Sequence, residues 1–137
     1  MHNKLKLFTV LLASCYFGSS VPEGRAMSKM ETTAAQCVID LVEPDPGTAS
    51  YLLGLGILAG PSDVGDFCSP SAASCALLVE GEIVYDGSDL GALVHEVLHH
   101  YEWVAYHRVD YGHSDPELWG KSGGEYSVEW GCRHEKF

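Results

Sequence analysis

The stretch Leu93–Glu102, LVHEVLHHYE, places three histidines and two glutamates within ten residues. On an α-helix, side chains four residues apart share one face, so His95 and His99 can reach one metal ion from the same side. His100 would lie about 100° further round the helix. The residue four positions before it is Glu96 rather than a histidine. The spacing therefore selects His95 and His99 as one pair of metal ligands.

This register is an HExxH motif, and its residue types fit zinc chemistry. Neutral imidazole is a good zinc ligand, and zinc lowers the pKa of a bound water to about 7. Glu96 would stand beside the open coordination position, where a carboxylate can act as a general base. We therefore predict a Zn²⁺ site at His95 and His99, with Glu96 as the catalytic residue.

The motif needs a helix to position it, and the apolar pattern predicts one. Apolar residues recur at i, i+3, i+4 and i+7 from Leu90 to Ala105, the stripe of a helix that buries one side. Residues 86–89 (DGSD) supply turn and N-cap residues before it. ALLV and EIVY, on either side of Glu80 and Gly81, predict two short strands or one bulged strand.

The other segments complete an α+β fold class. Residues 31–42 (ETTAAQCVIDLV) predict a first helix, which the prolines of EPDPG end. Thr48 could cap the apolar segment ASYLLGLGILAG, whose internal glycines leave helix and strand open. That segment lacks basic residues and a polar face, so we expect it in the core rather than on a membrane. The polar stretch PSDVGDFCSPSAASC is expected to be a loop.

The N-terminal residues are typical of an export signal, because MHNKLK is followed by the short apolar run LFTVLLAS. LASC at residues 12–15 resembles a bacterial lipobox, in which Cys15 is lipidated and becomes the first residue. Ordinary signal cleavage between about Ser20 and Ala26 is the alternative. We expect a signal over 1–14, a tether over 15–30 and one domain over 31–137. The protein would be anchored in the cell envelope through Cys15, or else secreted or periplasmic.

The cysteines support export. Without Cys15 four remain, an even number that favours two disulfides in an oxidising compartment. Cys68 and Cys75 close a small loop and form a natural pair. Cys37 with Cys132 would then tie the first helix to the last segment. No CxxC spacing occurs, so zinc ligation by cysteine is the weaker reading.

The composition narrows the partners. The chain has 137 residues, enough for one domain, and a formal net charge of −11. A field of that sign repels phosphate backbones and anionic lipid head groups, so we expect no nucleic-acid partner. Contact with a membrane would come through a lipid at Cys15.

HExxH on a helix after an edge strand resembles the zincin metallopeptidases. The resemblance implies a minimal zincin-like domain with an active-site helix, a short β-sheet and a C-terminal ligand helix. It also implies a peptide or protein substrate, which the strand before the helix could pair with in extended form. The metzincin branch would need glycine and histidine at Glu102 and Ala105, so that branch is excluded.

The gluzincin branch takes its third ligand from a later helix, within a motif of the type ExxAD. EYSVE at residues 125–129 matches in part, with valine for alanine and glutamate for aspartate, so the resemblance implies Glu125 as the third zinc ligand. Asp110 lies in a segment that faintly resembles the ligand segment of the aspzincins. Glu129 and His113 are further alternatives, ranked after Asp110.

Several questions stay open at this stage. The residue that would stabilise an oxyanion is not selected by spacing, and the candidates are Tyr111, His113, Tyr126 and His134. The three tryptophans are more typical of a core than of a substrate platform. Two further hypotheses are a non-catalytic lipoprotein that binds zinc, and a metal-free surface adaptor held by disulfides. Glu96 distinguishes the non-catalytic zinc-binding lipoprotein from an enzyme, because a structural zinc site needs no base.

Overall fold

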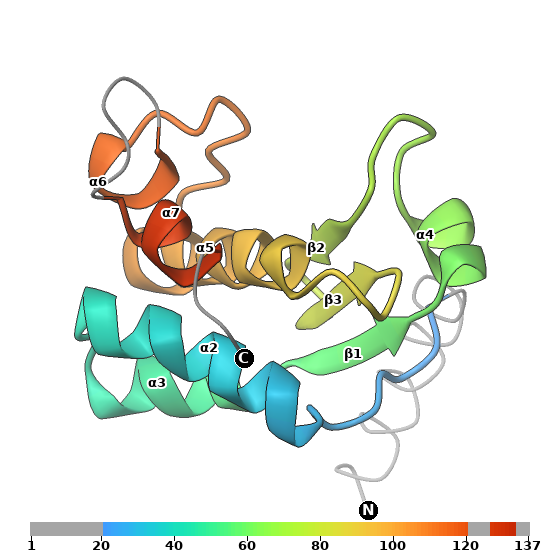
Figure 1. The fold of residues 1–137 in the computed structure, drawn as a ribbon, viewed down its shortest axis with the longest axis horizontal. Helices are drawn as coiled ribbons and strands as arrows, with labels where there is room; N and C mark the ends of the chain where they lie inside the picture. The colour runs from blue at the N-terminus through green and yellow to red at the C-terminus, as the bar shows by residue number, and fades with distance from the viewer. Residues whose placement is uncertain (1–20, 121–126, 134–137) are drawn as a thin grey trace, which may run out of the picture.

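The computed structural model describes residues 21–120 and 127–133, which form helices around a small sheet (Figure 1). The helices are α2 (Lys29–Val42), α3 (Pro46–Leu53), α4 (Pro61–Phe67), α5 (Leu90–Tyr106), α6 (Pro116–Trp119) and α7 (Val128–Arg133). The strands are β1 (Gly56–Ala59), β2 (Cys75–Leu77) and β3 (Glu82–Tyr85). This confirms the α+β class. Within these two ranges, no helix has the length and apolar content that crossing a bilayer requires.

The sheet has the order β1-β3-β2, with β3 parallel to β1 and antiparallel to β2. The resemblance to zincins implies that the strand before the active-site helix is an edge strand, which could pair with an extended substrate. That prediction is wrong, because β3 is the central strand and β1 and β2 occupy both of its edges. The outer edge of β1 meets Arg25 through an isolated bridge to Ile57. Among the described residues, no strand lies beside the outer edge of β2.

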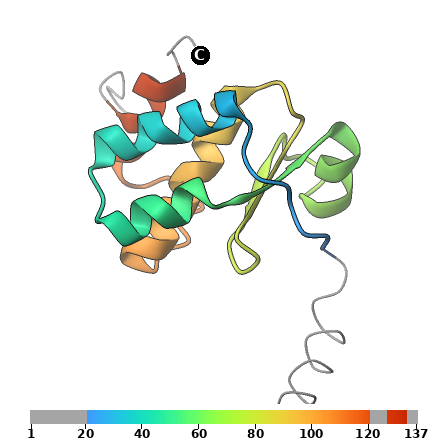
Figure 2. The same ribbon diagram turned by 90° about the horizontal axis from the view of Figure 1, so that it is seen from below.

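The core lies between α5 and the other elements. In Figure 1, α2 and α3 run as an antiparallel pair beneath α5, and the view from below in Figure 2 separates this pair from the sheet. The apolar stripe of α5 faces them, so Leu93, Val97 and Leu98 are buried against residues such as Val38 and Leu52. The opposite face of α5 is left for the histidines.

The helix ends explain how the apolar segment after the first helix divides. Asp45 caps α3, because its carboxylate accepts from the Thr48 N–H at 2.7 Å and Pro46 occupies the first helical turn. The expected cap at Thr48 is thus wrong, since Thr48 lies inside the helix. Gly54 ends α3 and β1 starts at Gly56, so this apolar segment is a helix followed by a strand.

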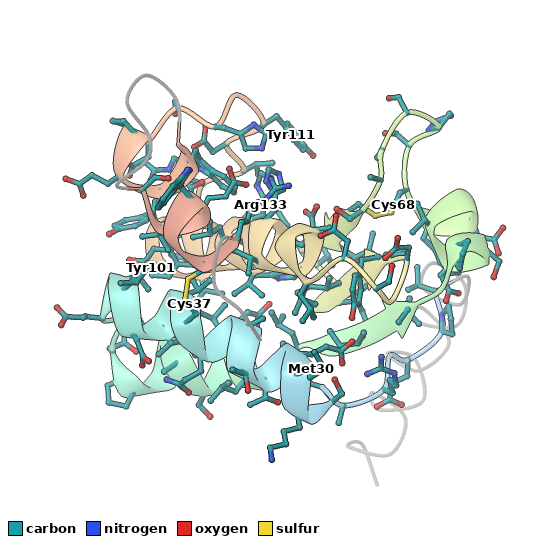
Figure 3. The ribbon with its side chains drawn as sticks, in the orientation of Figure 1. Met30, Cys37, Cys68, Tyr101, Tyr111 and Arg133 are labelled. Atoms are coloured by element: carbon teal, nitrogen blue, oxygen red, sulfur yellow. A yellow bond between two sulfur atoms is a disulfide. The ribbon has the colours of Figure 1, made fainter. Side chains whose placement is uncertain are left out.

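The stretch expected to be a loop contains a helix. Pro61 begins α4, which runs to Phe67, so only the part after Phe67 is irregular. The Cys68–Cys75 disulfide closes that part, and Cys37–Cys132 joins α2 to α7 (Figure 3). Both expected pairings are present, and they indicate folding in an oxidising compartment.

The segment before α2 belongs to the domain, although the sequence places residues 15–30 in a tether. Arg25 exchanges backbone hydrogen bonds of 3.0 and 2.8 Å with Ile57 of β1. Its guanidinium donates to both carboxylate oxygens of Glu31 at 2.6 and 2.9 Å, and the Tyr85 hydroxyl donates to the same carboxylate at 2.5 Å. The expectations for the signal and for Cys15 lie outside the described residues.

The ion pair between Arg25 and Glu31 makes the stability of the fold depend on pH. Burial acts to raise the pKa of Glu31, but hydrogen bonds from Arg25, Tyr85 and Ser28 outweigh it and lower the pKa from 4.5 to about 2. A group with a depressed pKa stabilises the fold above its unfolded pKa, and this contribution is lost as the pH falls through the folded pKa. Glu31→Gln should therefore cost about 3 kcal/mol of unfolding free energy at pH 7.

Urea unfolding of the parent and of Glu31→Gln between pH 7 and pH 2 measures this difference. The difference in unfolding free energy between the two proteins should decrease as the pH falls from about 4.5 to 2. The unfolding free energy of the control Glu43→Gln, at an exposed residue, should stay within about 0.5 kcal/mol of the parent. A difference that is the same at pH 2 and pH 7 would show that shape rather than charge carries the effect.

Candidate metal centre

Three histidines converge on one point at the open face of α5. His95 and His99 stand one helical turn apart, and His113 reaches them from the loop that follows the helix. The three Nε2 atoms form a nearly equilateral triangle: His95 to His99 is 3.2 Å, and His113 is 3.1 Å from each of the others. Within the part of the chain that the structure describes, this is the one cluster of its kind with spacing suited to a metal ion.

The triangle fits a metal ion held by three nitrogens. Tetrahedral zinc with Zn–N bonds of about 2.0–2.1 Å requires nitrogens about 3.3 Å apart. The observed separations of 3.1–3.2 Å are close to that value. Burial and the neighbouring His95 lower the pKa of His99 to about 4, so its imidazole is in the neutral, ligating form at neutral pH. The three residues can therefore hold a metal ion.

Glu129 of α7 fixes the orientation of His95. Its carboxylate only accepts, so the hydrogen bond from His95 Nδ1 requires a proton on that nitrogen. The Nε2 lone pair of His95 is then directed towards the other two imidazoles. A carboxylate behind a metal-ligating histidine sets its tautomer and increases its basicity. Glu129, one of the alternatives for the third ligand, instead lies behind His95.

Removing this carboxylate should weaken metal binding without abolishing it. Glu129→Ala is expected to raise the zinc dissociation constant about 10–100-fold, the usual effect of losing such a carboxylate. Competition with a coloured zinc chelator measures the constant. Glu117→Ala, an exposed glutamate on α6, is the matched control and should leave it unchanged. An unchanged constant in Glu129→Ala would mean that α7 does not support the centre.

The turn that presents His113 is built by Asp110. Its carboxylate accepts from the Ser114 N–H at 2.9 and 3.0 Å and from the Ser114 hydroxyl at 2.8 Å. The His113 N–H donates to the Asp110 carbonyl at 3.1 Å, and His113 has a positive φ of 51°. Burial acts to raise the pKa of Asp110, but the hydrogen bonds from Ser114, together with those involving Glu102 and Trp119, outweigh it and lower the pKa to about 2. Asp110, ranked second for the third ligand, therefore shapes the loop that carries His113.

The ring of Trp119 packs against all three histidines. Its ring centroid lies 4.9 Å from that of His95, 4.5 Å from His99 and 4.6 Å from His113. Its Nε1–H donates to Glu102 at 2.7 Å and to Asp110 at 3.1 Å. Glu102 is fully buried and also accepts from Arg108 at 2.6 Å. One polar network thus connects the end of α5 to the His113 loop and to the tryptophan below the histidines.

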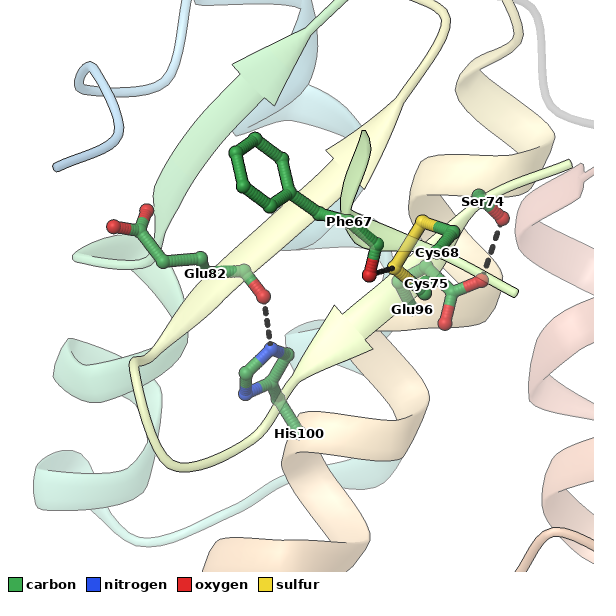
Figure 4. The surroundings of a disulfide bond; sticks show 7 residues. All are labelled: Phe67, Cys68, Ser74, Cys75, Glu82, Glu96 and His100. Atoms are coloured by element: carbon green, nitrogen blue, oxygen red, sulfur yellow. Dashed lines mark hydrogen bonds between the residues drawn. A yellow bond between two sulfur atoms is a disulfide. The ribbon is translucent and has the colours of Figure 1, made fainter. Parts of the chain in front are cut away.

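Glu96 lies beside the histidines in the wall of a cleft. It is only 4% exposed, and burial raises the pKa of its carboxyl group. The Ser74 hydroxyl donates to Glu96 Oε2 at 2.5 Å (Figure 4). Ser74 directly precedes Cys75, so the Cys68–Cys75 disulfide ties the loop that supplies this hydroxyl. The hydrogen bond from Ser74 fixes the position of the Glu96 carboxylate.

His100, the third histidine of the opening motif, is structural. It is fully buried on the far side of α5, and its Nε2 donates to the Glu82 carbonyl at 2.8 Å (Figure 4). Burial lowers its pKa to about 4, so the ring is neutral at neutral pH. This agrees with the prediction that His100 does not pair with another histidine of the helix.

The cleft has a volume of about 680 Å³ and opens onto His95, Glu96, His99 and His113. Residues of β2 and of the disulfide loop form one wall, and the loop with Tyr111 forms the other. Figure 3 places Cys68 and Tyr111 on opposite sides. All of β2, Cys75–Leu77, lines the cleft. A metal ion on the three nitrogens would keep one side open to this space.

Apart from Asp110 and Glu129, whose contacts are given above, the predicted site residues fall into three groups. His95, Glu96 and His99 lie together as expected, and His113, ranked last for the third ligand, joins them. Glu125, Tyr126 and His134 lie outside the described residues. Tyr111 is exposed at the mouth of the cleft. The sequence signal for His113 is the stretch DYGHS at 110–114, in which an aspartate and a glycine predict a turn that brings a histidine back towards the helix.

Comparison with known proteins gives no match to a protein-family model, to a curated protein or to a solved structure. The function is therefore argued from the site alone.

Proposed function

We propose that this protein is an exported zinc-dependent metallopeptidase, in which His95, His99 and His113 hold Zn²⁺ and Glu96 is the general base. One observation carries the proposal: the Nε2 triangle of the three histidines opens onto a cleft whose wall contains Glu96. Three protein ligands with an open fourth position are typical of catalytic zinc, whereas structural sites usually have four.

Zinc suits this donor set better than the other common ions. Imidazole nitrogen is a borderline ligand that favours zinc over calcium or magnesium, which prefer oxygen. Bound there, zinc would polarise a substrate carbonyl and make a water molecule acidic near neutral pH. The third ligand in this proposal is His113, whereas the resemblance to gluzincins implies Glu125. The proposed centre is thus zincin-like in its helix but differs from that branch in its third ligand.

Glu96 is placed to move the proton. Ser74 occupies Oε2, so Oε1 would accept a proton from the attacking water and return it to the leaving amine. The raised pKa of Glu96, caused by burial, favours this return of the proton. A glutamate with these properties is not required by a zinc site that only supports the fold. This favours an enzyme over the alternative of a non-catalytic zinc-binding or disulfide-stabilised surface lipoprotein.

The substrate that best fits the cleft is an extended peptide. Within residues 21–120 and 127–133 no strand lies beside the outer edge of β2, and the residues of β2 line the cleft, so β-strand addition there would align a peptide beside the three histidines. Leu77, Val79 and Tyr111 give the cleft apolar surface for side chains of such a peptide. Anchoring in the bacterial cell envelope through a lipid on Cys15 remains part of the proposal, with secretion or release into the periplasm as its alternative.

The test is hydrolysis of a mixture of unstructured peptides by the zinc-loaded chain, read by mass spectrometry. Peptide products with new amine and carboxyl termini should appear. Their formation should stop after chelation of the zinc and resume when zinc is restored. A chain that holds one zinc ion per molecule but releases no peptide product would instead support the non-catalytic zinc-binding hypothesis.

A further inference from the structure

A second site lies at Glu82 in β3. Its side chain is buried, with 6% of the residue exposed. The Gly24 N–H donates to Glu82 Oε1 at 2.8 Å. Oε2 is the one buried side-chain oxygen or nitrogen without a hydrogen-bond partner in the described ranges 21–120 and 127–133. A buried carboxylate with a single neutral donor is under-satisfied, because a charge needs a counter-charge or several hydrogen bonds in the interior.

The neighbouring groups do not supply that partner. The N–H groups of Gly56 and Ile57, which lie close by, donate to the carbonyls of Gly81 and Arg25 at 3.0 and 2.8 Å. The Arg25 guanidinium is directed to Glu31 instead. Glu82 Oε2 can therefore accept a hydrogen bond from a positively charged donor that lies next to it, near Gly24.

Two glycines enclose the carboxylate and leave no room for a side chain. A Cβ atom on Gly24 would lie 2.1 Å from Glu82 Oε2, and one on Gly56 would lie 1.9 Å from the same atom. Only a residue without a side chain can hold its main-chain nitrogen at this position. The enclosure thus selects the backbone nitrogen of Gly24 as the group that meets Glu82.

We propose that the mature protein begins at Gly24, and that its α-ammonium group binds the Glu82 carboxylate. Hydrolysis of the Glu23–Gly24 bond adds the hydroxyl of water to the Glu23 carbonyl carbon and its hydrogen to the Gly24 nitrogen. The new amine takes up one proton near neutral pH, since its reference pKa is about 7.7–8.0. The resulting group has three N–H donors in place of one, enough for both oxygens of Glu82, and it neutralises the buried charge.

The bond to be cut is accessible. Pro22 and Glu23 are exposed, lie outside any helix or strand and precede the bridge that Arg25 makes with β1. Arg25 and the residues after it would keep their place on the sheet after the cut. Gly24 also falls within the stretch 20–26 where ordinary signal cleavage is the alternative to a lipobox. Cleavage there would release the domain from residues 1–23, including Cys15, so this inference takes the secreted or periplasmic alternative in place of a lipid anchor.

The site also connects the N-terminus to the helix that carries the histidines. The backbone carbonyl of Glu82 accepts from His100, the residue directly after His99 (Figure 4). The inference is independent of zinc and of peptidase activity, because it rests on the contacts of Gly24, Gly56 and Glu82 alone.

A full chain with a cleavable sequence tests the pairing. ENLYFQ in place of residues 18–23 lets a site-specific protease cut before Gly24, and the melting temperature is measured before and after the cut at pH 7. We expect a rise on the order of 5 °C. A matched control carries ENLYFQ at residues 17–22 with Glu23→Gly, so that the new amine lies one residue away. The control should shift by no more than about 1 °C.

A second variant tests whether the rise in melting temperature depends on the charge of Glu82 or only on cutting the chain. In Glu82→Gln the side-chain oxygen can still accept from Gly24, so the uncut chain should fold and melt close to the parent, but the rise on cutting should be lost. The pair stabilises the fold while the amine is charged, so the parent's rise should disappear as the pH increases through the folded pKa of the amine. Equal shifts in the parent, the control and Glu82→Gln, or no shift in the parent, would overturn the pairing. N-terminal sequencing of the protein exported by its host should give Gly24, and any other first residue would overturn the processing.

Discussion

Replacing Glu96 by glutamine is expected to lower kcat/KM for peptide hydrolysis by about 10²–10⁴-fold, the usual contribution of a general base. Glutamine keeps the size of the side chain and can still accept from the Ser74 hydroxyl, so the cleft wall should be unchanged. It cannot take a proton from water at neutral pH. The zinc content should stay at one ion per chain, because Glu96 is not among the three proposed ligands.

Steady-state hydrolysis of a peptide found by the mass-spectrometric screen measures this effect, with zinc content determined on the same samples. Glu117→Gln, an exposed glutamate on α6, provides the matched control and should keep the parent rate. If Glu96→Gln hydrolyses the peptide at the parent rate with zinc bound, Glu96 is not the base and the proposed mechanism fails.

Replacing His113 by alanine is expected to weaken zinc binding more than 100-fold, beyond the roughly 10–100-fold that loss of a supporting carboxylate costs. Two nitrogens would remain, and His95 and His99 alone leave two coordination positions without protein ligands. The fold should persist, because His113 lies in a loop whose Asp110–Ser114 bonds do not involve its ring. Elemental analysis after dialysis against a weak chelator gives the zinc content per chain.

Asp110→Asn and Glu125→Ala, compared with His113→Ala, distinguish the possible third ligands. His107→Asn is the control for a surface histidine: His107 is exposed at the end of α5 with a positive φ of 53°, a conformation that asparagine tolerates. Asp110→Asn should weaken zinc binding less than His113→Ala, because asparagine retains part of the turn. Glu125→Ala should leave zinc binding intact. Zinc lost in Glu125→Ala but kept in His113→Ala would restore the gluzincin-like ligand set.

The sequence predicts the parts of this site that depend on local periodicity. Period and capping residues place His95, Glu96 and His99 on one helix that begins after Asp89, and the structure has that helix with that cap. The cysteine count and the short CSPSAASC loop predict both disulfides. These features depend on residues close in sequence, or on the few ways in which four cysteines can pair.

The parts that depend on distant contacts are not predictable in the same way. His113 reaches the cluster because Glu102, Trp119 and Asp110 hold its loop against the end of α5, and no spacing rule encodes that network. The order β1-β3-β2 likewise depends on pairing across the chain, and it assigns the open edge to β2 rather than to the strand before the helix. The partial motif match ranks Glu125 above His113, and Glu125 lies outside the described residues. The structure brings His113 to His95 and His99.

The most direct test of the zinc centre is a crystal structure of the zinc-loaded protein with anomalous diffraction measured at the zinc edge. The account predicts one peak at about 2.0–2.1 Å from the Nε2 atoms of His95, His99 and His113, with its fourth side open to the cleft. A peak held by His95 and His99 together with a carboxylate, or a peak elsewhere on the molecule, would contradict it.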